Sequence, residues 1–520
     1  MPIIGRNSPI RRTFDSGDGG GGPIPGPDGN LLRTPAGQPR HVRMAIVGSG
    51  FAGLCMAIKL KQAGRHDFVI LERADAVGGT WRDNTYPGCE CDVPSHLYSY
   101  SFEPYPDWPR PFACQSDIRD YTEHCFDKYG IRPHVQLRAT LERAEWDDAR
   151  KLWRIQTSAG AFTADMIASG MGGLSNPLIP DFPGLDRFQG ASFHSARWDH
   201  DYDFEGKRVA VIGTGASTIQ FLPEIAPKAA HLTLFQRTPA WVLPKRNAPY
   251  SARQKWVFRN VPLAQRLHRA RIFTTFEAFG LAFRRPRTMN AVRKQGIAHI
   301  EQYIDDPELR KLLTPDYTPG CKRILMSNKY YPALARDNVS VTGSGIREVR
   351  EHSIVTEDGV EHEVDVIVFG TGFDIMRERT PERIVGRDGV ELHELWHAQT
   401  PEAYLGTLVA GFPNLFMLGG PNSGLGHNSI IFMLEGAVRQ TMMAIEHMEA
   451  QGKRTVEVRK DAQDRYNEEV QRKLATTVWN TGCSSYYRND DGKIVAIWPG
   501  SAASYRLATR KLREQDLLLD

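Results

Sequence analysis

A glycine-rich turn near the start of the chain has the residues needed to bind a pyrophosphate. Gly48, Gly50 and Gly53 form G-x-G-x-x-G after the apolar strand predicted over Arg43–Gly48, and a stretch with helical spacing follows. The glycines permit a tight turn, a close approach of backbone to phosphate, and close helix–strand packing. Glu72 ends the next predicted strand, where a carboxylate can accept hydrogen bonds from a ribose diol. The unit predicts a bound adenine dinucleotide, FAD or NAD.

A second turn of this kind lies at Gly213 and Gly215, with Thr218 in place of the third glycine. We expect slightly looser helix–strand packing there. The following strand, HLTLF, leads into QRT, so Arg237 stands near the position of the ribose-binding acid. Because arginine can donate a bidentate, charge-assisted pair of hydrogen bonds to a 2′-phosphate, this site is predicted to bind NADPH. Two dinucleotide sites in one chain suggest electron transfer from nicotinamide to flavin.

The composition is that of a globular enzyme of two or three domains. The chain has 520 residues, and 65 basic against 61 acidic side chains leave a net charge of +4, too small to imply nucleic-acid binding. No apolar run is long enough to span a bilayer, and the first residues do not resemble a secretory signal. The stretch from about Ser251 to Leu313 carries apolar residues at helical spacing together with many Arg and Lys. Such a helix could lie on a membrane, but a helical subdomain with a solvated basic face is the favoured interpretation.

Seven scattered cysteines favour a reduced, cytoplasmic protein over a disulfide scaffold. Cys89 and Cys91 form C-x-C, but no second Cys/His pair at ligand spacing accompanies them, so no metal site is expected.

One further segment, FQGASFHSARWD (Phe188–Asp199), combines aromatic residues with His194 just ahead of the second turn. A lone histidine beside a tryptophan is most often a packed core residue. The segment also fits F-x-G-x-x-x-H-x-x-x-W-[P/D], and GGTWRDNTYPGCECD (Gly78–Asp92) fits a second signature. With DVPSHLYSYSFEPYPDW, GCKR and FGTGF, these motifs make the chain from about residue 42 to 500 similar to the Baeyer–Villiger monooxygenases. In that family the segment joins two domains, so the resemblance gives His194 a structural role at a hinge.

The resemblance also implies a reaction. NADPH reduces FAD, O2 adds to flavin C4a, and the resulting peroxide attacks a ketone to give an ester or lactone. Arg323 matches the family's catalytic arginine, whose fixed charge would stabilise the developing anion. Asp92 matches the carboxylate that orients this arginine, and Lys322 would contact the NADP 2′-phosphate together with Arg237.

From the two turns and the resemblance together, we expect two sets of cofactor-binding residues. The FAD set is Gly48, Gly50, Phe51, Ala52, Gly53, Glu72, Thr80, Trp81, Arg82, Asp92 and Tyr98. The NADP set is Gly213, Thr214, Gly215, Ala216, Ser217, Thr218, Gln220, Arg237, Thr238, Lys322 and Arg323.

Near the C-terminus the chain departs from the family pattern. Many relatives carry a Trp that faces the nicotinamide and substrate, whereas CSSYY places Tyr486 there, so the substrate pocket is not predicted. An N- or S-oxygenating flavin monooxygenase is the main alternative, although such relatives typically lack the terminal Trp-Asp. A pyridine nucleotide–disulfide oxidoreductase would need C-x-x-C or C-x4-C, which is absent. A nucleotide sensor would bind NADPH without consuming it.

The predicted fold class is α/β, with two Rossmann-like dinucleotide-binding domains for FAD and NADP. We expect a flexible extension over 1–40, the FAD domain over 41–175 and 371–520, and the NADP domain over 176–370. A helical subdomain is expected within the NADP domain at about 250–315. The expected partners are a small ketone and O2, and a monomer is possible.

Overall fold

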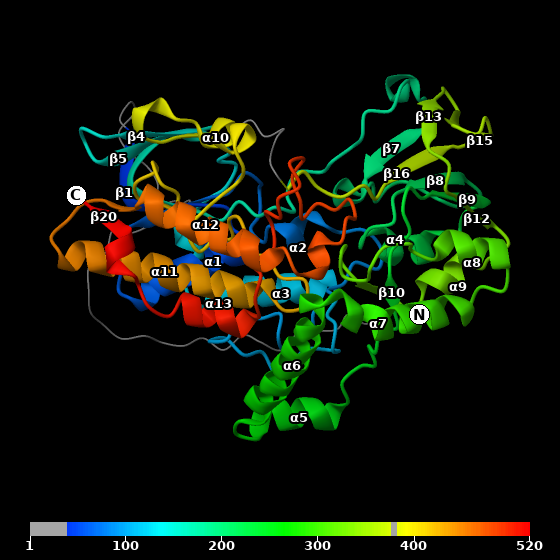
Figure 1. The fold of residues 1–520 in the computed structure, drawn as a ribbon, viewed down its shortest axis with the longest axis horizontal. Helices are drawn as coiled ribbons and strands as arrows, with labels where there is room; N and C mark the ends of the chain where they lie inside the picture. The colour runs from blue at the N-terminus through cyan, green and yellow to red at the C-terminus, as the bar shows by residue number, and fades with distance from the viewer. Residues whose placement is uncertain (1–38, 376–381) are drawn as a thin grey trace, which may run out of the picture.

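The structure is a computed structural model that describes residues 39–375 and 382–520. The extension expected over 1–40 lies outside these residues, except that the first strand already begins at Arg40. Two sheets lie side by side in separate parts of the molecule, and a helical hairpin projects away from both (Figure 1).

The first sheet is built from both ends of the chain. Its parallel centre pairs β1 (Arg40–Val47) with β2 (Phe68–Leu71) on one side and β6 (Gly160–Ser169) on the other. The remaining strands are β3 (Val135–Gln136) beside β2, the antiparallel pair β4 (Leu141–Asp147) and β5 (Leu152–Thr157), and the late strands β17 (Arg383–Val385) and β18 (Leu415–Met417). Residues after 382 therefore complete a sheet that begins at Arg40.

The second sheet is wholly parallel, in the order β12-β9-β8-β16-β7. Its strands are β7 (Ala191–His194), β8 (Arg208–Ile212), β9 (His231–Phe235), β12 (Val339–Thr342) and β16 (Val366–Phe369). An antiparallel sheet of β13 (Ile346–Val349), β14 (Ser353–Thr356) and β15 (Glu361–Glu363) lies between β12 and β16 in the sequence. The fold is of the predicted α/β class.

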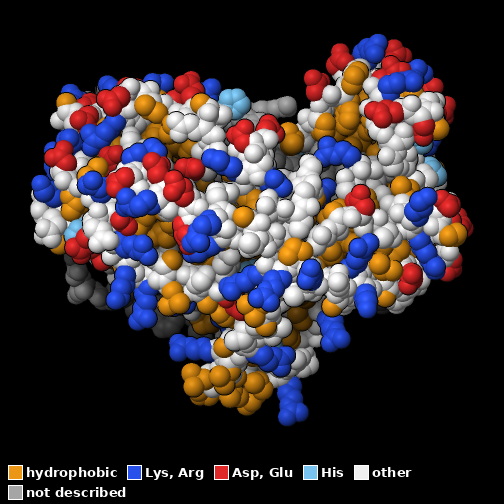
Figure 2. Space-filling model, viewed as in Figure 1, with side chains coloured by type: hydrophobic (Ala, Val, Ile, Leu, Met, Phe, Trp, Pro, Cys, Tyr) orange, Lys and Arg blue, Asp and Glu red, His pale blue; other side chains and the backbone are white. Residues whose placement is uncertain are grey.

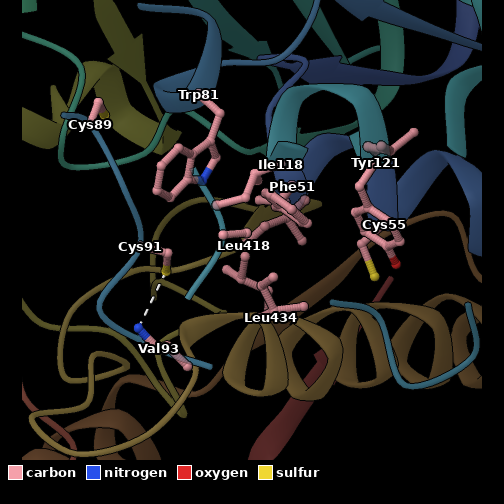
Figure 3. Close-up of a cluster of buried hydrophobic side chains, with 14 of the residues drawn as sticks. Phe51, Cys55, Trp81, Cys89, Cys91, Val93, Ile118, Tyr121, Leu418 and Leu434 are labelled. Carbon is pink, nitrogen blue, oxygen red and sulfur yellow. Dashed lines mark hydrogen bonds between the residues drawn. The ribbon is translucent and has the colours of Figure 1, made fainter. Parts of the chain in front are cut away.

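Helices from distant parts of the sequence form the main core. α1 (Phe51–Gln62) packs on α11 (Ile430–Ala450) and α3 (Gln115–Lys128). The side chains of Phe51, Ile118, Leu418 and Leu434 meet in one buried apolar cluster (Figure 3). The other elements of this half are α2 (Thr80–Asp83), α10 (Leu392–Ala398), α12 (Lys460–Leu474), α13 (Ala502–Ala508) and the pair β19 (Val456–Val458) and β20 (Leu517–Leu519).

The helical subdomain lies between two short strands that pair in parallel at its base. β10 (Val242–Leu243) precedes it and β11 (Leu325–Met326) follows it. The helices are α5 (Ala252–Asn260), α6 (Ala264–Gly280), α7 (Asn290–Glu301) and α8 (Pro307–Leu313), while α4 (Thr218–Ile225) and α9 (Tyr330–Leu334) pack against each other beside the second sheet. Since β10 and β11 pair, the residues that flank them are brought close together.

Thr218, in place of the third glycine of the second turn, is accommodated by a glycine elsewhere. Thr218 is buried, and a Cβ added at Gly370 would lie 2.0 Å from its Oγ1. Gly370 follows β16, the strand beside β8. Because Gly370 has no side chain, it provides the space that the Thr218 side chain occupies. The side chain of Thr218 consequently faces the sheet.

This packing predicts a specific double-mutant result. Gly370→Ala should lower the stability by about 1–3 kcal/mol because the new methyl group overlaps the threonine hydroxyl. In a Thr218→Gly background the same methyl group has room, so its penalty should vanish, although Thr218→Gly alone costs about 1 kcal/mol as a helical glycine. Thermal unfolding of the four proteins measures both effects. An equal penalty in both backgrounds would show that the two residues do not compete for space.

Candidate functional site

The first glycine turn forms a backbone surface from which side chains are excluded. Gly48 has a φ of +95°, and a Cβ on Gly53 would lie 1.9 Å from the Gly48 carbonyl oxygen. A second turn approaches it, since a Cβ on Gly79 would lie 2.9 Å from the Gly50 Cα. α1 begins directly afterwards at Phe51, with Ala52 buried behind the turn. Free amides at a helix N-terminus beside bare backbone suit a pyrophosphate.

Glu72 is buried next to this turn and is held as a carboxylate. It accepts hydrogen bonds from the Ser49 amide and hydroxyl and from the Ala74 amide, and it pairs with Arg82 at 2.8 Å. Burial alone would raise the pKa of Glu72, but the Arg82 charge and these hydrogen bonds outweigh it and lower the pKa. The predicted ribose acceptor is therefore ionised and fixed in position.

An aromatic wall continues from the turn. The Trp81 indole donates a hydrogen bond of 3.0 Å to the Tyr98 hydroxyl, and both Trp81 and Phe51 contact the Tyr98 ring edge-on. Thr80, the first residue of α2, lies beside them and is half-buried. The predicted FAD residues thus form one continuous region.

At the second turn, the predicted NADP residues 213–217 line the turn itself, whereas Gln220 contacts another part of the molecule. Gly215 and Ala216 are exposed, Gly213 has a φ of +104°, and Ser217 precedes α4. The Thr214 hydroxyl donates to the Thr238 carbonyl at 2.7 Å, which connects the turn to the segment that follows β9.

Gln220 instead connects this turn to the first half of the molecule. Its side-chain amide donates to the Glu90 carbonyl at 2.9 Å and accepts from the Tyr86 hydroxyl at 3.0 Å. A Cβ on Gly88 would lie 2.7 Å from the Gln220 carbonyl oxygen, so the two segments are in close contact. The polar atoms of Gln220 therefore face the loop of residues 86–90.

Two cations lie together beside the second turn without a carboxylate partner. Arg237 is exposed, and among the described residues neither it nor Lys322 forms an ion pair. The Lys322 ammonium lies 5.1 Å from the centre of the Tyr317 ring. Burial and the nearby Arg237 charge lower the pKa of Lys322, while Asp316 opposes this change. Because the two cations repel each other, an anion with more than one negative charge would stabilise them by binding between them.

The predicted catalytic pair is formed. Arg323 Nε and Nη2 each donate to one Asp92 oxygen at 2.7 Å, joining residues that are 231 positions apart. Asp92 raises the pKa of Arg323. Burial would raise the pKa of Asp92, but Arg323 lowers it by its charge and its hydrogen bonds. Both side chains remain partly exposed, so the guanidinium is oriented and still accessible.

Lys245 is a site residue that the sequence analysis missed. Its buried ammonium donates to the Cys91 carbonyl at 3.0 Å and pairs with Glu90 at 2.7 Å. Lys245 comes just after β10 and Arg323 just before β11, so the two cations stand at opposite ends of this parallel strand pair, and each contacts the segment 90–92. In the sequence LPKRNAP this lysine resembles a surface charge, and no local pattern distinguishes it.

A disulfide brings the C-terminal segment to the same place. Cys321 and Cys483 are bonded across 162 positions. Tyr486 and Tyr487, whose hydroxyls lie 3.3 Å apart, are close enough to Arg323 to raise the pKa of its guanidinium. The cross-link contradicts the expectation of reduced cysteines, because only the fold brings these two thiols together. Cytoplasmic location, which was inferred partly from that expectation, stays a prediction.

The other cysteines of the described residues are free, and Cys89 and Cys91 are both buried. Burial raises the pKa of Cys89 to about 12 and also raises that of Cys91. Both thiols therefore stay protonated at neutral pH.

Comparison with known proteins extends over most of the chain. Residues 41–263 match the family model for flavin-binding monooxygenase-like proteins. A Baeyer–Villiger monooxygenase of Pseudomonas aeruginosa is 49% identical over 92% of this chain and 91% of its own length. One from Streptomyces coelicolor is 48% identical over 91% of each chain. This chain belongs to the Baeyer–Villiger monooxygenase family.

Solved structures of this family have the same fold. An oxidized steroid monooxygenase bound to NADP is 31% identical, with a TM-score of 0.81 over 92% of this chain and 99% of that one. Cyclohexanone monooxygenase from Rhodococcus sp. Phi1 bound to NADP+ is 28% identical, with a TM-score of 0.84 over 93% of this chain and 100% of that one. The predicted fold class is confirmed.

The family segment Phe188–Asp199 is structural in this monooxygenase. His194 ends β7 beside β16, and its Nδ1 accepts from the Ala196 amide at 3.1 Å. Burial lowers its pKa to about 4, so the ring is neutral at physiological pH. Trp198 packs on Phe204 and Phe221. Since β16 leads back toward the first sheet, this segment braces the connection between the two halves.

The disulfide predicts a thiol count. Monooxygenase that is denatured in an alkylating reagent without reductant should be labelled on five cysteines, and a sample reduced before labelling should be labelled on seven. A non-reducing peptide map should link the peptides that contain Cys321 and Cys483. Seven free thiols before reduction would contradict the cross-link.

Proposed function

We propose that this protein is an FAD- and NADPH-dependent monooxygenase that inserts one oxygen atom beside a ketone carbonyl. Ketone, O2, NADPH and a proton would give an ester or lactone, NADP+ and water. The observation that carries the proposal is the accessible Arg323–Asp92 pair, placed between two dinucleotide-type turns. The names of the relatives at 49% and 48% identity support the same reaction.

FAD fits the first turn. The bare backbone of Gly48, Gly50 and Gly53 would hold its pyrophosphate, and the ionised Glu72 would accept from the ribose. The wall of Trp81 and Tyr98 leads from this turn toward Asp92 and would flank the flavin. When bound, FAD takes two electrons from NADPH and passes them to O2.

NADPH fits the second turn. Gly213, Gly215 and the N-terminus of α4 would hold its pyrophosphate, and Arg237 with Lys322 would hold its 2′-phosphate. A phosphate ester between two cations that form no ion pair with a described carboxylate would accept charge-assisted hydrogen bonds that NADH cannot form. The coenzyme would therefore be selected by its extra phosphate.

Arg323 would supply the charge that oxygen insertion requires. Its guanidinium keeps its proton at any physiological pH, and Asp92 raises its pKa further. It can therefore stabilise a negative oxygen by hydrogen bonding without transferring a proton to it. Asp92 occupies the Nε–H and one Nη2–H and fixes the plane of the group, which would leave Nη1 and the second Nη2–H to face the reacting atoms. A donor preorganised in this way typically contributes about 2.7–4 kcal/mol to transition-state stabilisation.

The alternative of an N- or S-oxygenating flavin monooxygenase is not favoured. Trp198 and Asp199 complete the Baeyer–Villiger form of the family segment, and the curated relatives at about half identity carry the Baeyer–Villiger name. Product analysis with ketones, amines and sulfides separates the two activities.

The coenzyme assignment predicts the effect of Arg237→Ala. The KM for NADPH should rise roughly tenfold or more, since a charge-assisted phosphate contact is lost, whereas the KM for NADH should hardly change. Steady-state kinetics with both coenzymes measure the difference. Arg253→Ala, which removes an arginine from the hairpin, is a matched control. Equal changes for the two coenzymes would remove Arg237 from the phosphate site.

The catalytic assignment predicts uncoupling in Arg323→Ala. This variant should bind FAD and oxidise NADPH in air, but ester formation should fall by about 10²–10³ because the anion loses its fixed cation. The electrons should then appear as hydrogen peroxide. Arg323→Lys keeps the charge without the planar fork that Asp92 orients, so it should restore little ester. The measurement is ester formed per NADPH consumed, alongside a peroxide assay. Wild-type ester yield in the alanine variant would remove Arg323 from the mechanism.

A further inference from the structure

The tip of the α5–α6 hairpin exposes large apolar side chains. Trp256 is 60% exposed, Leu263 61% and Leu267 67%, and Val261 and Pro262 are exposed between the two helices. Figure 2 shows an apolar patch near the bottom of the molecule, where the hairpin of α5 and α6 projects in Figure 1. Trp256 is also the one exposed tryptophan among the ten in the chain, all of which the structure describes.

Backbone strain accompanies this exposure. Leu263, in the turn, has a φ of +64°, a conformation that a bulky side chain rarely adopts. Glycine or asparagine would form the same turn at lower cost. The chain therefore has an exposed leucine at a position where glycine or asparagine would make the folded state more stable. This indicates that the Leu263 side chain has a function.

The hairpin is fixed rather than loosely attached. On its inner side, Arg269 donates to the His96 carbonyl and to the Ser99 hydroxyl at 3.1 Å. Farther along α6, Phe273 packs on Phe432 of α11. The inner face of α6 thus attaches the hairpin to the body of the protein, and the apolar tip points away from it.

Basic side chains surround the tip. Residues 251–300 contain eleven Lys and Arg residues and a single acid, Glu277. Glu277 accepts hydrogen bonds from Asn428 and from the Ala502 and Ala503 amides, so it does not neutralise the tip. Near the tip Arg259 pairs with Asp107, whereas Arg253, Lys255, Arg266 and Arg271 form no ion pair with any described carboxylate. Lys and Arg side chains flank the apolar patch in Figure 2.

We propose that the hairpin tip docks on an anionic lipid bilayer. Trp256, Leu263 and Leu267 would enter the boundary between headgroups and acyl chains, and the unpaired cations would contact the lipid phosphates. An apolar edge bordered by Arg and Lys, with a tryptophan at the boundary, is the pattern of an interfacial helix. None of the described helices is long and apolar enough to cross a membrane, so the contact is with one surface.

The charge favours lipid over a second copy of the chain. A symmetric contact between two tips would place both sets of cations face to face, and like charges across an interface oppose association. Protein interfaces also have few charged residues at their centres, whereas here the basic side chains border a small apolar patch directly. An anionic bilayer provides acyl chains for the apolar side chains and, at its surface, phosphates for the basic side chains that surround them.

The hairpin also connects this surface to the C-terminal segment. After α6 the chain continues into residues 281–284, where Phe283 stacks on Trp479, in the cluster that contains Tyr487. A ketone dissolved in the bilayer would then be close to the enzyme, a consequence that rests on the proposed function. The lipid contact itself does not depend on the reaction.

Vesicle sedimentation tests the proposal with the purified full-length flavoprotein. It should bind vesicles of phosphatidylcholine with 30% phosphatidylglycerol at least tenfold more tightly than pure phosphatidylcholine, and high salt should weaken the binding. Each cation near an anionic surface contributes about fivefold, so Arg253→Gln/Lys255→Gln/Arg266→Gln should reduce binding by roughly a hundredfold. Leu263→Ser/Leu267→Ser should reduce it at least tenfold. Val360→Ser, at a 49% exposed residue of the distant β14–β15 turn, is the matched control and should bind as the wild type does.

Fluorescence locates the contact. Brominated lipid should quench the emission of Trp256, and Trp256→Phe should abolish that quenching without lowering NADPH oxidation with a water-soluble ketone. Failure to bind anionic vesicles at low salt, or equal binding by the tip variants and the control, would overturn the proposal. If the tip variants instead lower the mass of the lipid-free particle, the patch is an interface between copies. Because binding is measured without turnover, an enzyme that binds vesicles but makes no ester would overturn only the proposed function.

Discussion

The paired hydrogen bonds between Arg323 and Asp92 are the constraint on which the arrangement of this molecule depends. A guanidinium can serve as a fixed cation at a reacting oxygen only if its plane is held and some of its donors remain accessible. Asp92 comes from the half that carries the first glycine turn, whereas Arg323 follows the helical subdomain. The pair therefore forms only when both halves and the base of the subdomain are in place.

Several contacts hold these segments together. The β10–β11 pair joins the segment that carries Lys245 to the segment that carries Arg323, and Lys245 pairs with Glu90 two residues before Asp92. Gln220 ties α4 to the same loop, and the Cys321–Cys483 disulfide attaches the C-terminal segment two residues from Arg323. These contacts involve Glu90 or Cys321, or the strand that follows Arg323, so they hold the segments that carry Arg323 and Asp92 next to each other. Arg237 and Lys322, beside the second turn, are different, because neither forms an ion pair with a described carboxylate, as the proposed phosphate site requires.

Local sequence predicted the parts of this site that depend on local geometry. A strand, a glycine turn and a helix follow one another in the chain, so Gly48, Gly53 and Gly213 could be assigned directly. Arg323 and Asp92 were found only through the family motifs, since 231 positions separate them. The contacts of Lys245, Gln220 and the disulfide are created by tertiary packing and have no local pattern. Thr218 shows the same limit, because the space for its side chain is provided by Gly370, which only the sheet order places beside it.

The most direct test of this account is the substitution Asp92→Asn, which preserves the shape of the side chain and removes its charge. If Asp92 acts by orienting Arg323, FAD content and the rate of flavin reduction by NADPH should stay within about twofold of the wild type. Ester formed per NADPH consumed should fall at least roughly tenfold, with hydrogen peroxide making up the difference. Wild-type ester yield in this variant, or a parallel loss of flavin reduction and ester, would contradict the central role of the pair.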